Sequence, residues 1–137
     1  MKNRVAVDTG PLVALFDHSD ADHHKARDFF FRLEFDGVVT TAVITEVTHL
    51  LGFDPRAAVE FLQWLKREAL RIEDVSGDMD RIVELMTKYA DLPMDFADAT
   101  IVAACERLHI RDVASLDSDF AIYRLHGRQH FHNRFPL

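Results

Sequence analysis

Four acidic residues far apart in the sequence could act together: Asp8, Glu46, Asp98 and Asp117. Each stands where a strand end or a helix terminus would present its side chain. Carboxylates a few ångströms apart repel, and each raises the pKa of its neighbour unless a cation or a proton intervenes. Hard divalent cations such as Mg²⁺ bind oxygen ligands and commonly serve phosphoryl chemistry. These residues therefore predict a metal site suited to phosphodiester hydrolysis, with a nuclease as the working hypothesis.

The elements that would position these acids alternate between strands and helices. Short apolar runs predict strands at 4–8, 38–41, 71–75 and 112–116. Helical periodicity and proline positions predict helices at 11–17, 20–34, 42–51, from Pro55 to about 69, 79–89 and 95–108. Such alternation predicts an α/β fold with a mostly parallel sheet, in which ligands bind at the carboxyl ends of the strands. Asp8 and Asp117 lie at two of these ends.

Asp98 is the most informative of the acids. On a helical wheel it falls within the apolar arc of the 95–108 segment, while Thr100 and Arg107 lie opposite; the arc contains Ile101, Val102, Cys105 and Leu108. A carboxylate on an inward face must be paired, protonated or metal-bound. Asp95, one turn earlier, shares that side, and a helix cap explains one of the two acids but not both.

The other acids have ordinary alternatives. Asp8 could cap the helix that follows it, a role compatible with metal binding. Glu46 lies at the margin of an apolar stripe and could be a solvated helix residue. Asp117 and Asp119 follow the last strand, where turns favour aspartate, and only one of them need be a ligand.

Composition points to one domain over residues 1–137, because 48% of the residues are hydrophobic and no linker divides the chain. No apolar run is long enough for a signal peptide or a membrane span, and the lone Cys105 suits a reducing cytoplasm. The net charge of −7 is unusual for a nucleic-acid enzyme, but part of it belongs to the proposed site. Phe29–Phe31 and Trp64 exceed what one core easily absorbs and predict an interface.

Taken together, these segments resemble the PIN-domain ribonucleases, particularly the small VapC-like toxins of bacterial toxin–antitoxin pairs. The resemblance covers nearly the whole chain and rests on four segments in order: 5–16, 45–47, 95–103 and 115–120. Each segment alone is weak, whereas all four at suitable spacing are specific. Ser115 stands where many relatives have threonine, a departure that keeps a hydroxyl group.

The resemblance implies a Mg²⁺- or Mn²⁺-dependent endoribonuclease with a three-layer α/β/α sandwich around a mostly parallel central sheet. It implies a homodimer, an RNA substrate, products with 5′-phosphate and 3′-hydroxyl ends, and inhibition by a cognate antitoxin. The implied acids are Asp8, Glu46, Asp98 and Asp117, with Asp95 as an accessory acid, Asp119 as a further candidate ligand, and the Thr9 hydroxyl beside Asp8.

Other classes fit less well. A haloacid-dehalogenase-type phosphatase needs a second aspartate where Gly10 stands, and a receiver domain needs a lysine near the last strand. The main alternative is a non-catalytic acidic interaction module with a PIN-like fold. His130 and His132 could form half of a zinc site but have no third ligand at motif spacing. The basic segment 124–134 could contact RNA phosphates, and His23-His24 are expected on an exposed helix face.

Overall fold

The computed structural model describes residues 3–32, 34–67 and 69–136. Its centre is a five-stranded sheet in the order β3-β2-β1-β4-β7, and every neighbouring pair is parallel. The strands are β1 (Asn3–Val7), β2 (Phe35–Thr40), β3 (Arg71–Glu73), β4 (Asp112–Ala114) and β7 (His132–Asn133). Beside the sheet, β5 (Arg124–Leu125) and β6 (Gln129–His130) form an antiparallel hairpin.

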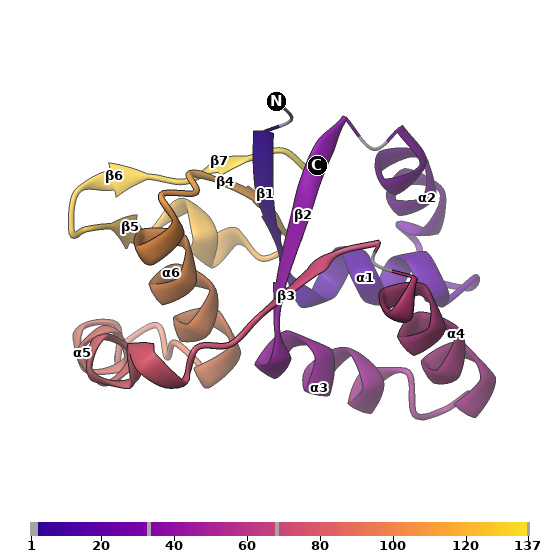
Figure 1. Cartoon of the computed structure of the whole chain (residues 1–137), viewed down its shortest axis with the longest axis horizontal. Coiled ribbons are helices and arrows are strands. Elements are labelled where there is room, and N and C mark those ends of the chain that lie inside the picture. The colour runs from indigo at the N-terminus through magenta and orange to yellow at the C-terminus, as the bar shows by residue number, and fades with distance from the viewer. Residues whose placement is uncertain (1–2, 33, 68, 137) are drawn as a thin grey trace.

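Helices cover both faces of this sheet. They are α1 (Thr9–Phe16), α2 (His23–Arg32), α3 (Thr41–Leu50), α4 (Pro55–Lys66), α5 (Met79–Lys88) and α6 (Phe96–Leu108). In Figure 1, α5 and α6 lie on one side of β1 and β2, while α1, α2 and α4 lie on the other. The predicted three-layer α/β/α sandwich is confirmed. Among the described residues, no helix combines the length and the apolar character that crossing a membrane requires.

The element boundaries differ modestly from those predicted. The second strand begins at Phe35, earlier than expected, and the last of the four predicted strands ends at Ala114. The helix predicted over 20–34 begins at His23, because the Asp20 side chain accepts a hydrogen bond from the Asp22 amide at 2.8 Å and forms a turn there. Residue 33 of that prediction lies outside the described residues.

The core sits between the sheet and the helices. Val5, Val7, Val38 and Val39 of β1 and β2 are at most 3% exposed, because a parallel sheet is covered on both faces. Burying each such side chain contributes ~1.5–3 kcal/mol. The β1 strand lies at the centre, so the carboxyl end of this strand is surrounded by protein on most sides.

Helix α6 is buried on all sides rather than along one stripe, with every residue from 97 to 106 buried. Thr100 is fully buried, donates to the Ala97 carbonyl at 2.6 Å and lies 2.9 Å from the Thr40 hydroxyl. Thr100, which the helical wheel places opposite the apolar arc, is therefore buried as well. Helix α6 packs against α5, α3 and β2 together, and a single amphipathic face does not describe such an environment.

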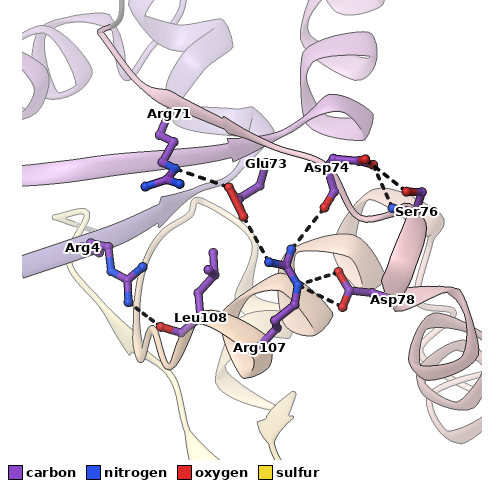
Figure 2. A network of polar contacts seen from close by, with 8 residues as sticks. All are labelled: Arg4, Arg71, Glu73, Asp74, Ser76, Asp78, Arg107 and Leu108. Carbon is purple, nitrogen blue, oxygen red and sulfur yellow. Dashed lines mark hydrogen bonds and ion pairs between the residues drawn. The ribbon is translucent and has the colours of Figure 1, made fainter.

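Arg107 ties the end of α6 to the edge of the sheet (Figure 2). Its guanidinium donates to Glu73 of β3 at 3.2 Å and to both carboxylate oxygens of Asp78 at 3.1 Å. It also donates to the Asp74 carbonyl at 3.2 Å. Because Asp78 belongs to the short 3₁₀ helix η1 (Ser76–Asp78), one side chain joins three segments that are distant in sequence.

The phenylalanine run predicted as an interface is mostly part of the fold. Phe30 is 4% exposed and meets the Trp64 ring edge-on, while Phe29 packs against Phe35 of β2. Only Phe31, at 87% exposure, points away from the rest of this group. The premise that these rings exceed what the core absorbs was wrong for Phe29 and Phe30, because the aromatic cluster between α2, α4 and β2 takes them up. An interface at the exposed Phe31 stays a prediction.

The histidine expectations are also partly corrected. His23 is buried rather than exposed, and its Nδ1 lies 2.8 Å from the Ala14 carbonyl, which joins α2 to α1. His130 and His132 lie on separate strands, and His132 lies 3.2 Å from Asp112. In the described part of the chain, neither joins a group of side chains close enough to hold a metal ion.

The basic segment 124–134 makes internal contacts. Arg134 pairs with Asp112 at 3.3 Å, and Arg124 donates to the backbone carbonyls of Ala121 and Ile122. Contact between this segment and RNA phosphates stays a prediction.

Candidate metal centre

Three of the predicted acids converge at the carboxyl end of the sheet. Asp8, Asp98 and Asp117 each place a carboxylate oxygen within 4.8 Å of the oxygens of the other two. Asp8 follows β1, Asp98 lies in the first turn of α6, and Asp117 follows β4. The hydrogen bond from the Asp8 amide to the Ala114 carbonyl, at 2.9 Å, holds the first and last of these segments together.

Asp8 is held by hydrogen bonds at both carboxylate oxygens. Its Oδ1 caps α1 by accepting from the Thr9 amide at 2.8 Å, and its Oδ2 accepts from the Ser115 hydroxyl at 2.7 Å. Burial raises the pKa of Asp8 from 3.8 to about 6, these hydrogen bonds oppose that rise, and the charges of Asp117 and Glu46 add to it. The cap and the acid cluster thus share one residue, as the sequence allowed.

Asp98 is the acid whose ionisation is most disfavoured. Its pKa is raised from 3.8 to about 8, chiefly by burial. A hydrogen bond from Tyr123 lowers the pKa, and the charges of neighbouring acids raise it; these acids are Asp8, Asp95 and Asp117. The Tyr123 hydroxyl donates to Asp98 Oδ2 at 2.8 Å. Asp95 is the helix cap, since its Oδ1 accepts from the Asp98 amide at 2.8 Å. The cap therefore explains Asp95 and leaves Asp98 pointing into the cluster.

Geometry separates Asp117 from Asp119, between which the family pattern does not decide cleanly, although Asp117 is favoured. Asp117 Oδ1 accepts from the Asp119 amide at 2.9 Å and caps the 3₁₀ helix η2 (Ser118–Ala121). The Asp117 amide donates to the Ser115 hydroxyl at 2.9 Å, so Ser115 contacts both Asp8 and this turn. Among the described acids, Asp117 belongs to the group of converging oxygens and Asp119 does not.

Glu46 lies apart from the three converging carboxylates but shares their cleft. It is half-buried on α3 and lines a cleft of about 350 Å³ together with Asp8, Asp98 and Asp117. Asp95 lines the same cleft. In the part of the chain that the structure describes, no lysine or arginine lines it. The cleft therefore concentrates negative charge without an internal cation to balance it.

Sequence reasoning missed three residues of this region. Asp20 and Asp22 line the cleft from the loop between α1 and α2. Their only sequence signal is the spacing of two acids in a turn, which is common in loops. Tyr123 is the third, and its distance from Asp98 in the sequence gave no indication that the two side chains meet.

The residues present fit a hard divalent cation. Carboxylate oxygens are the ligands that Mg²⁺ and Mn²⁺ prefer. Burial, with a smaller contribution from the neighbouring acids, raises the pKa values of Asp8 and Asp98, and a bound cation would offset both effects. The Thr9 hydroxyl oxygen is buried beside Asp8 and has no hydrogen-bond partner among the described residues. Hydrogen bonds from Ser115 and Tyr123 to the acids resemble the outer contacts that orient metal ligands.

Comparison with known proteins identifies the family. Residues 5–124 match the PIN domain. Ribonuclease VapC26 of Mycobacterium tuberculosis is 28% identical over 116 residues, covering 81% of this chain and 84% of that protein. The crystal structure of Mycobacterium tuberculosis VapC20, a sarcin-ricin loop cleaving toxin, has a TM-score of 0.79 at 25% identity and covers 86% of this chain and 93% of that one. A toxin–antitoxin complex from Klebsiella pneumoniae shares the fold, with a TM-score of 0.65 at 18% identity over 85% of this chain and 90% of that one. The resemblance seen in the sequence is thereby confirmed, and this chain belongs to the PIN-domain family as a VapC-like member.

Proposed function

We propose that this chain is a metal-dependent endoribonuclease and the toxin of a toxin–antitoxin pair. The observation that carries the proposal is the convergence of Asp8, Asp98 and Asp117 in an acidic cleft with no lysine or arginine among its described lining residues. Membership of the PIN-domain family supports it, as do the names of two relatives, one a ribonuclease and the other an RNA-cleaving toxin.

We assign the acidic quartet to Asp8, Glu46, Asp98 and Asp117, with Asp95 as an accessory acid. The assignment of Asp117 rather than Asp119 rests on the converging oxygens. Glu46 is included because it lines the same cleft and because its charge helps to raise the pKa of Asp8. We assign the whole of residues 1–137 to one PIN-like domain.

The site would work through charge and position. A bound Mg²⁺ or Mn²⁺ would supply a water of lowered pKa and would polarise the scissile phosphate. The carboxylates of Asp8, Asp98 and Asp117 would hold that cation. Ser115 would keep the Asp8 carboxylate in place, and Asp95 would fix the start of α6 and so the position of Asp98. No side-chain nucleophile is needed.

Partners follow from the same proposal. RNA is the substrate, and a cognate antitoxin would block the cleft by placing a cation, such as an arginine side chain, among the carboxylates. We further propose a homodimer and a cytoplasmic location; the single buried thiol of Cys105 suits a reducing compartment.

The second candidate is a non-catalytic acidic interaction module with the same fold. One observation favours it: Asp8, Asp95 and Asp117 each accept a backbone hydrogen bond as caps, which gives these acids a structural task. The two candidates differ in cation binding, because acids that serve only as caps need not bind Mn²⁺ stoichiometrically, whereas the ligands of a catalytic metal must.

A cleavage assay decides between them. The purified wild-type protein is incubated with a mixed RNA pool in Mg²⁺, in Mn²⁺ or in a chelator, alongside Asp98→Asn and the control Asp36→Asn. Asp36 is an exposed acid near the amino end of β2, at the opposite end of the strand from the cleft. We expect cleavage only with a divalent ion, retained in the control and reduced at least ~100-fold in Asp98→Asn, since losing even an outer partner of a metal ligand costs ~10–100-fold. Wild-type protein that neither cuts RNA nor binds Mn²⁺ would favour the interaction module.

A further inference from the structure

Tyr123 contacts the acid cluster although it belongs to none of the segments that carry the family resemblance. The side chain is fully buried, and its hydroxyl donates to Asp98 Oδ2 at 2.8 Å. The hydroxyl of a buried tyrosine is therefore the hydrogen-bond donor to this carboxylate.

The position of this hydroxyl is tightly determined. The Tyr123 ring meets the rings of Tyr89 and Phe120 edge-on, each at 5.1 Å between centroids. Its backbone amide donates to the Asp119 carbonyl at 3.0 Å. A side chain enclosed in this way has few alternative rotamers, so the hydroxyl presents its proton to one place.

The turn that carries Tyr123 also carries one of the converging acids. Asp117 caps η2 at the start of this turn, and Tyr123 lies just beyond its end. One short segment thus supplies the Asp117 carboxylate and also the group that holds the Asp98 carboxylate of α6. Asp8 has an equivalent partner in Ser115, which donates to its Oδ2.

A carboxylate that accepts a hydrogen bond at one oxygen keeps its other oxygen in a defined direction. Outer contacts of this kind orient metal ligands, and losing one typically weakens metal binding ~10–100-fold. The Tyr123 contact occupies Asp98 Oδ2 and leaves Oδ1 without a hydrogen-bond role among the described residues. We propose that Tyr123 is a positioning residue of the metal centre, whose hydroxyl fixes the Asp98 carboxylate so that its second oxygen can bind the cation.

This inference rests on the proposed function, and Tyr123→Phe tests it because the substitution removes only the hydroxyl. Tyr89→Phe is the matched control. Tyr89 is a second buried tyrosine in the same ring cluster, and its hydroxyl accepts from the Arg124 amide at 3.0 Å rather than contacting an acid. Mn²⁺ affinity is measured by titration calorimetry, and the melting temperature is measured in a chelator, for both variants and the wild type.

We expect Tyr123→Phe to weaken Mn²⁺ binding by ~10–100-fold and Tyr89→Phe to leave the affinity within about twofold of wild type. In the cleavage assay, Tyr123→Phe should raise the half-saturating Mn²⁺ concentration by the same factor, and most of the rate should return at saturating Mn²⁺. A purely structural tyrosine would lower the melting temperature without this selective shift in metal dependence.

Three results would overturn this inference and leave the proposed function standing. The first is unchanged Mn²⁺ affinity in Tyr123→Phe, and the second is an equal loss in Tyr89→Phe, which would assign the effect to packing. The third is a Tyr123→Phe chain that does not fold while Tyr89→Phe does, which would make the hydroxyl a requirement of the core. If the wild-type protein binds no Mn²⁺, both the proposed function and this inference are ruled out. If wild type and Tyr123→Phe bind Mn²⁺ equally well, only the inference is ruled out.

Discussion

Replacing Asp8 by asparagine removes one charge from the acid cluster and leaves the shape of the side chain almost unchanged. The asparagine oxygen can still accept from the Thr9 amide, so the cap of α1 survives. Burial raises the pKa of Asp8 from 3.8 to about 6. Because one pKa unit corresponds to ~1.4 kcal/mol, ionised Asp8 costs the metal-free fold ~3 kcal/mol relative to the unfolded chain.

The sign of the pH dependence follows from proton binding. Between about pH 4 and pH 6 the folded chain holds the Asp8 proton more often than the unfolded chain does. The free energy of unfolding contributed by Asp8 therefore falls as the pH rises through this window, and the full penalty is present near pH 7.5. The asparagine in the variant does not titrate, so the free energy of unfolding of Asp8→Asn lacks this pH-dependent contribution.

Urea unfolding in a chelator, followed by circular dichroism, measures the difference. We expect the stability of Asp8→Asn minus that of wild type to increase by ~2.5 kcal/mol between about pH 4 and about pH 7.5, because a small part of the full penalty is already present at pH 4. Comparing the two proteins at each pH cancels the titration of the other acids to a first approximation. A difference that stays constant, or that shifts in favour of wild type as the pH rises, would refute the claim that Asp8 is held ionised at a cost.

Three further predictions concern other residues. Asp98→Asn should keep the fold and abolish RNA cleavage. Without metal it should melt at or above the wild-type temperature, because the environment that raises the pKa of Asp98 to about 8 disfavours the charged carboxylate. A variant that unfolds instead would make Asp98 a structural residue. Glu46→Gln should reduce cleavage strongly while changing stability by less than ~0.5 kcal/mol, because Glu46 is half-buried, and unchanged cleavage would remove it from the site. Arg107→Ala should lower the free energy of unfolding, measured in urea, by ~2 kcal/mol, because it leaves Glu73 and Asp78 without their shared partner. Cleavage at saturating Mn²⁺ should stay unchanged. A selective loss of cleavage would contradict this structural role.

Much of the fold was predictable because local signals agreed with one another. The Asp54-Pro55 pair does begin α4, with the Asp54 side chain accepting from the Arg56 amide at 3.1 Å. The apolar run before Asp8 does form the central strand β1. Such signals depend on neighbouring residues alone, so no knowledge of tertiary contacts is needed to use them.

The environment of α6 was harder to predict from periodicity. A wheel assigns each residue to an inner or an outer face, and it correctly placed Asp98 on an inner one. Thr100 is also buried, because α6 is enclosed by the sheet and by other helices. Periodicity does not distinguish one buried face from several, so it did not show that Thr100 is buried too.

The choice between Asp117 and Asp119, and the role of Tyr123, depend on tertiary geometry. Both acids lie in one turn, and only the positions of the carboxylate oxygens show which of them joins Asp8 and Asp98. Tyr123 meets Asp98 across 25 residues of sequence, a contact set by how the last turn packs on α6. Neither feature produces a local pattern.

Locating Mn²⁺ by anomalous scattering would show whether the converging carboxylates bind a divalent cation. Crystals of the wild-type protein would be soaked in Mn²⁺, and an anomalous difference map would be calculated. We expect a peak within ~2.0–2.3 Å of carboxylate oxygens from at least two of Asp8, Asp98 and Asp117. A map with no peak in this cleft, in crystals of protein that cleaves RNA in the same Mn²⁺ solution, would contradict this expectation.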